Sequence, residues 1–121
     1  MRNELQMARY EEIDIDQGAD VAIELHLIND DGSVKNLSGH DCAAKLKRSY
    51  NSDSSDTTDF TVSLQDSDGI ATLALTNAQT DLLKSGRYVY DVELSYVDSG
   101  GSTIIERILE GTITVSPSVT K

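Results

Sequence analysis

Tryptophan is absent from this 121-residue chain, and cysteine, proline and phenylalanine occur once each. A single cysteine excludes an internal disulfide, so the fold must be held together by packing alone. One proline and eight glycines argue against a collagen-like or low-complexity chain. The shortage of tryptophan and phenylalanine counts against an aromatic platform for sugars or nucleobases. No apolar run approaches the roughly 18 residues of a membrane-spanning helix.

Basic residues are also scarce, because 10 Lys and Arg stand against 21 Asp and Glu, which gives a net charge of −11. Such a surface repels nucleic acid and anionic lipid, so we expect no nucleic acid and no membrane among the partners. Residues 1–5 lack the apolar core of a signal peptide, which favours a protein made in the cytoplasm. The length predicts one domain that buries a hydrophobic core of its own.

The clearest pattern in the chain is an alternation over residues 86–96. One face carries the large side chains Tyr88, Tyr90, Val92, Leu94 and Tyr96. The opposite face is polar except for Val89, so the pattern predicts a strand with one buried and one solvated face. Gly86 two residues before Tyr88 is the layout of a structural tyrosine corner in an immunoglobulin-like sandwich. Tyr90 then occupies the place of an antibody domain's second cysteine.

Seven further segments show strand-like patterns bounded by turn residues: 13–18, 20–28, 34–37, 40–49, 60–64, 70–76 and 103–115. Residues 51–58 contain no apolar side chain, so we expect an exposed loop there. Residues 76–84 are the one helix candidate, and either Thr76 or Asn77 can cap it.

These segments amount to about seven to nine short strands and one short helix. Their turn signals recur every 8–12 residues, which is typical of a sandwich. The sequence therefore predicts an all-β fold, an immunoglobulin-like antiparallel β-sandwich. We expect residues 1–12 to form an N-terminal arm or edge strand and residues 13–121 to form the sandwich domain.

The last strand, over residues 103–115, breaks the simple alternation. The expected inward side chains are Ile105, Leu109, Ile113 and Val115. Gly111 inside this run indicates a bulge or a close backbone approach. Val89, Ile104 and Ile108 fall on the face expected to be solvated, and they share it if the last two strands pair. They are candidate interface residues; the alternative is that they line the N-terminal arm.

The tripeptide HDC at residues 40–42 is the one feature that approaches a nucleophile motif. A cysteine nucleophile needs a histidine in contact with it and a third group that orients this histidine. Cys42 instead shares its parity with Ala44 and Leu46, so we expect an unreactive core thiol. The sequence contains no HExxH, CxxC or two-histidine arrangement. We therefore expect no catalytic residue, no cofactor and no metal site, and hence no enzyme.

Acidic residues gather in three loops, and carboxylates of this kind are the ligands that calcium prefers. They are Asp30 and Asp31, then Asp53, Asp56 and Asp59, then Asp66 and Asp68. None of the groups has the twelve-residue spacing of an EF-hand. Because aspartate is also an ordinary turn residue, solvated loops are the simpler interpretation, and calcium binding stays an open alternative.

Seven phrases in order carry a resemblance to a known family. They are DQGAD (16–20), NLSGH (36–40), AKLKR (44–48), DFTV (59–62), LALTNAQT (73–80), GRYVYDVEL (86–94) and RILEGTITV (107–115). Over residues 13–120 the chain resembles small immunoglobulin-like virion structural proteins of tailed bacteriophages, and the related N-terminal domain of baseplate upper proteins. The last two strands are the most specific part. This family usually carries a tyrosine where this chain has His40.

The resemblance implies a virion structural or accessory protein, made in the cytoplasm of the host bacterium and located in the virion. It would act through protein–protein contacts in the baseplate, tail, neck or capsid surface. The implied partners are other virion proteins and further copies of the chain, as a homo-oligomer or on a symmetric ring partner. The alternative is a decoration or adhesin-like module that binds a host surface or glycan, although the aromatic shortage counts against sugar stacking.

Overall fold

The computed structural model describes residues 9–49 and 57–119, which form two β-sheets and one short helix. The described strands are β1 (Arg9–Asp16), β2 (Val21–His26), β3 (Asp41–Lys47), β4 (Thr57–Asp59), β5 (Thr61–Gln65), β6 (Ile70–Leu75), β7 (Gly86–Val97) and β8 (Thr103–Ser116). The helix α1 spans Asn77–Asp81 and lies between β6 and β7 in sequence. None of the described helices is long and apolar enough to cross a membrane.

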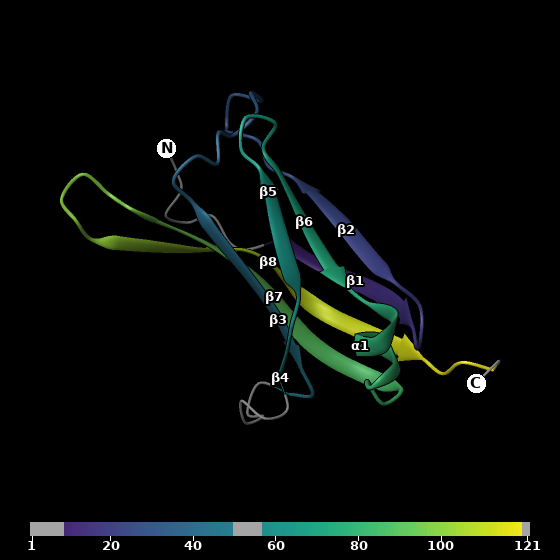
Figure 1. The fold of residues 1–121 in the computed structure, drawn as a ribbon. Helices are drawn as coiled ribbons and strands as arrows, with labels where there is room; N and C mark the ends of the chain where they lie inside the picture. The colour runs from purple at the N-terminus through teal and green to yellow at the C-terminus, as the bar shows by residue number, and fades with distance from the viewer. Residues whose placement is uncertain (1–8, 50–56, 120–121) are drawn as a thin grey trace.

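The two sheets have the strand order of an immunoglobulin-like sandwich. One sheet runs β1-β8-β7-β3-β4 and the other β2-β6-β5 (Figure 1). Strands β8, β7 and β3 occupy the places of the G, F and C strands, and β2, β6 and β5 those of B, E and D. Neighbouring strands are antiparallel, except that β1 runs parallel to β8. The predicted all-β fold class is confirmed.

The core lies between the sheets and is made of the alternate residues of each strand. Its buried members are Ile15, Ala44, Leu46, Phe60, Leu73, Leu75, Leu83, Tyr88, Tyr90, Val92, Leu109, Ile113 and Val115. Strand β7 supplies three of these residues, and β8 lies beside it and supplies three more. The alternation over residues 86–96 correctly predicted a half-buried strand, and the structure places this strand at the centre of the larger sheet.

Both core tyrosines of β7 satisfy their hydroxyl groups on backbone carbonyls. The Tyr88 hydroxyl donates to the carbonyl of Lys84 at 2.8 Å, so the predicted tyrosine corner is confirmed. The Tyr90 hydroxyl donates to the carbonyl of Glu11 in β1 at 3.0 Å. Burial and the nearby Glu11 carboxylate raise the pKa of Tyr90 to about 12. These bonds allow large amphipathic side chains to be buried without an unpaired hydroxyl.

The helix α1 begins with a capping box at Thr76, which confirms a helix here, although it ends at Asp81 and not at residue 84. The Thr76 hydroxyl accepts from the Gln79 backbone N–H, and the Gln79 side chain accepts from the Thr76 N–H. The fully buried Thr80 hydroxyl accepts from the N–H of Gly18 and donates to the carbonyl of Ala19. The helix therefore anchors the turn between β1 and β2.

Several boundaries differ from the sequence expectation. Residues 34–37 form no strand, only an isolated bridge between Val34 and Ile28. Residues 57 and 58, expected to be loop, belong to β4, because this segment pairs with the edge of β3. Strand β1 runs across the expected boundary between residues 12 and 13. Residues 1–8 lie outside the described residues.

Candidate interaction surface

The β7–β8 hairpin extends beyond the other strands at the end that carries its turn (Figure 1). Strand β3 pairs with β7 as far as Ser95. On the other side, β1 pairs with β8 over residues 109–116 and stops there. Among the described residues, no strand flanks the backbone of residues 103–108 on the side away from β7. We call residues 103–108 the hairpin edge.

The turn of the hairpin is held by one aspartate. Asp98 Oδ1 accepts from the N–H groups of Gly100 and Ser102, both at 2.9 Å. Gly101 has a φ of 86°, a conformation that glycine adopts at little cost. The projecting end is therefore a closed, hydrogen-bonded hairpin, which suits it to present side chains to a partner.

A β-bulge at Ile108 changes which side chains of β8 face the core. Val92 lies opposite Leu109, but the next residue, Glu93, lies opposite Arg107, so β8 contains one extra residue. Because side chains alternate with a period of two, one extra residue reverses the parity of everything on its N-terminal side. The sequence predicted either a bulge or a close backbone approach at Gly111. The structure has the close approach there, between Gly111 and the backbone of Glu11.

This bulge overturns the expected grouping of Val89, Ile104 and Ile108. Val89 lies opposite Thr112 on the outer face, while Ile104 lies opposite Tyr96, on the parity of the buried strand face. Ile108 packs against the core cluster. The premise that the three residues share one outer face is wrong, although each is half-buried. Their role as interface residues stays a prediction.

Two other apolar side chains occupy the outer face of the projecting end. Ile105, expected to point inward, is 61% exposed because of the reversed parity, and Val97 is 65% exposed. Ile105 lies opposite Ser95, and Val97 opposite Thr103. The sequence did not indicate that Ile105 is exposed, because no residue type marks the position of the bulge at Ile108.

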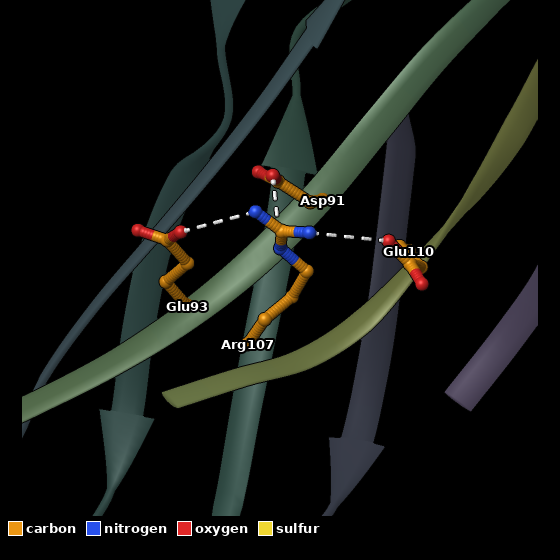
Figure 2. Close-up of polar contacts among 4 residues, drawn as sticks. All are labelled: Asp91, Glu93, Arg107 and Glu110. Carbon is orange, nitrogen blue, oxygen red and sulfur yellow. Dashed lines mark hydrogen bonds and ion pairs between the residues drawn. The ribbon is translucent and has the colours of Figure 1, made fainter. Parts of the chain in front are cut away.

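Next to these apolar side chains lies a group of four charged residues (Figure 2). The Arg107 guanidinium is 3.4 Å from Asp91, 3.9 Å from Glu93 and 3.4 Å from Glu110. One positive charge thus faces three carboxylates, which leaves two negative charges uncompensated. Each pair is solvent-exposed and contributes no more than about 1 kcal/mol to stability. The group therefore matters more for the local field than for the free energy of folding.

The side chains of His40 and Cys42 have different neighbours. The His40 ring lies near Ser38, whose carbonyl oxygen is 3.2 Å from Nδ1, and near the ring of Tyr96, at 5.0 Å between centroids. Cys42 is half-buried and packs against the core, and burial raises the pKa of its thiol to about 11. A thiol held protonated in this way is a poor nucleophile at neutral pH.

The acidic loops show local turn bonding. Asp31 accepts from both the N–H and the hydroxyl of Ser33, and these bonds lower the pKa of its carboxyl. Within residues 9–49 and 57–119, no three His, Cys, Asp or Glu side chains are grouped as metal ligands. Asp53 and Asp56, which belong to one candidate calcium group, lie outside the described residues.

No model of a protein family matches the sequence, and no curated protein matches it either. Among solved structures, the chain is similar to murine CRIg, with a TM-score of 0.47 and 18% sequence identity. That similarity covers 89% of this chain and 92% of the CRIg chain. At these values the similarity carries no argument about function.

Proposed function

We propose that this protein is a structural or accessory protein of a tailed-phage virion, and that it acts through protein–protein contacts. The observation that carries the proposal is the projecting β7–β8 hairpin, with Val97 and Ile105 exposed on a hydrogen-bonded scaffold. Large apolar side chains gathered on a projecting element are typical of a contact surface. A rigid sandwich that presents one such hairpin suits a building block.

The sequence resemblance supports the same proposal from a separate direction. Its most specific phrases, over residues 86–94 and 107–115, are the two strands of this hairpin. The resembled family consists of virion structural proteins. Because virion parts are symmetric, the protein would occur in several equivalent copies, as a homo-oligomer or on a symmetric ring of another virion protein.

Quantitative mass spectrometry of purified particles of the phage that encodes this protein tests the proposal. Wild-type protein should be present in a fixed copy number that matches the symmetry of the particle. An Ile105→Glu variant should be incorporated less, because it places a charge on the contact surface. The matched control is Leu82→Glu, at an 85% exposed position just after α1. Particles that lack the wild-type protein would refute the virion assignment.

A further inference from the structure

The strands at the free edges of the sandwich differ in whether they carry large exposed apolar side chains. In the described part of the chain, large exposed apolar side chains within strands are found at Tyr10 in β1, Val97 in β7 and Ile105 in β8. Of the edge strands, β2, β4 and β5 carry none, whereas β1 carries Tyr10. The hairpin edge combines the exposed side chain of Ile105 with backbone that no described strand pairs, and both favour the addition of a further strand.

The charges along the hairpin edge change from one end to the other. Near the turn, residues 104 and 105 are both isoleucine. Further from the turn come Glu106, which is exposed, and Arg107, which is surrounded by the carboxylates of Asp91, Glu93 and Glu110. Three carboxylates against one guanidinium leave an excess of two negative charges on the outer face, and Glu106, opposite the buried Leu94, adds one on the other face. Lys45 of β3 lies opposite Asp91 in the sheet, and its amino group is 3.9 Å from Asp59.

We propose that the hairpin edge binds an extended segment of a partner protein as an additional β-strand. This segment is apolar where it lies beside residues 104–105 and basic where it lies beside residues 106–107. Main-chain hydrogen bonds would supply affinity, and alternate side chains would supply specificity. The inference deepens the proposed function by naming its contact, and it rests on that function only for the source of the partner.

Charge selects a basic segment over a second copy of the chain. A second copy carries the same net charge of −11, so the overall repulsion between two copies opposes their pairing. Charged residues and a bulge are also features that prevent indiscriminate edge pairing, and both occur here, at Glu106, Arg107 and Ile108.

Hydrogen exchange of the full-length protein is the first test. Amides of residues 103–108 that point away from β7 should exchange fast in the free protein, because no strand among the described residues covers them. Protection that is independent of protein concentration would mean that the chain covers its own edge. Protection that grows with concentration would mean that a second copy does. Either result would overturn the proposal.

Binding of synthetic peptides is the second test. The probes are acetylated and amidated Thr-Val-Val-Lys-Lys-Thr and its reverse sequence, which cover both strand directions. At least one should bind and slow the exchange of the edge amides, more weakly as salt rises. Three control peptides should not bind: the same probe with glutamate for lysine, with N-methylated backbone amides, or with serine for valine. No binding by either probe at millimolar concentration, or equal binding by the glutamate control, would overturn the proposal.

Variants of the protein locate the binding site. Ile105→Ser removes the apolar contact and Glu106→Gln removes a charge at the edge, so each should weaken peptide binding by about fivefold or more. Leu82→Ser, at a more exposed apolar position away from the hairpin, should leave the affinity unchanged. If all three variants bind equally, the peptide binds elsewhere and the proposal is wrong. Because this test uses no particles, its failure leaves the virion assignment to its own experiment.

Discussion

The two ends of the β7–β8 hairpin consist of the same pair of strands but differ in which strands flank them and in how deeply their side chains are buried. At the sandwich end, β1 flanks β8, and Ile113 and Val115 are almost completely buried. At the projecting end, past the bulge, β1 no longer flanks β8, and Ile105 is largely exposed. A single extra residue at Ile108 separates a region that is buried in the sandwich from one where an apolar side chain of β8 is exposed.

The largest contrast is expected between two glycines of this hairpin. A Cβ at Gly111 would collide with the backbone of Glu11, in a conformation that other residues rarely adopt. Gly111→Ala should therefore lower the free energy of unfolding by about 4 kcal/mol, as overpacking and backbone strain together. Gly101→Ala meets nothing within 4 Å and carries only the backbone strain, about 1 kcal/mol. Urea unfolding of both variants measures the difference, and equal losses would contradict the close approach at Gly111.

Two isoleucines of β8 have the same side chain but differ in burial, so the same substitution should affect stability differently at each. Ile113 is 0% exposed, so Ile113→Ala should cost about 3 kcal/mol through lost burial and a cavity. Ile105→Ala, on the projecting end, should change stability by no more than about 0.5 kcal/mol. Thermal and urea unfolding would show this directly. A loss of more than 2 kcal/mol for Ile105→Ala would mean that β8 lacks the reversed parity.

The tyrosine corner should have a smaller effect. Tyr88→Phe removes only the hydroxyl that donates to Lys84, and it should cost about 1 kcal/mol. Tyr10→Phe is the control, because Tyr10 is largely exposed, and its effect should be near zero. Equilibrium unfolding at neutral pH compares the two, and equal stability of Tyr88→Phe and wild type would remove the corner's energetic role.

Thiol labelling compares the two regions without a change in stability. The raised pKa of Cys42 makes its thiolate fraction about a hundredfold smaller than that of an ordinary thiol below pH 9. A cysteine introduced by Ser99→Cys, in the exposed hairpin turn, should react with a bulky thiol reagent at least tenfold faster. The Ser99→Cys variant also carries Cys42→Ala, so that only the introduced cysteine can react, and wild type reports on Cys42. Fast labelling of native Cys42 would contradict its packing against the core.

The same raised pKa predicts how Cys42 responds to pH. Because the folded state favours the protonated thiol, its contribution to stability is complete below about pH 9 and is lost as pH rises toward 11. Wild type should therefore lose stability relative to Cys42→Ala over this window. Unfolding curves from pH 8 to pH 11 measure the sign, and a gain with rising pH would contradict the burial of Cys42.

Local patterns predicted most of the fold, because each depends on neighbours in sequence. The alternation around Tyr88 identified the half-buried strand and its corner, and the candidate caps Thr76 and Asn77 identified the start of the helix. Turn residues placed most strand boundaries. The short strand β4 could not be predicted, since Thr57–Asp59 has no apolar pattern and is ordered by pairing with β3.

By itself, then, the sequence determined the all-β class, the half-buried strand over residues 86–96 and the excess of acidic residues, because periodicity and charge are properties of the chain alone. Tertiary structure alone decided the bulge at Ile108 and the parallel pairing of β1 with β8. Those two features expose Ile105 and leave the hairpin edge uncovered by described residues. The physical reason is that the register depends on how two strands pair. An extra residue is accommodated where the neighbouring backbones permit it, and the type of residue at that position does not indicate where this occurs.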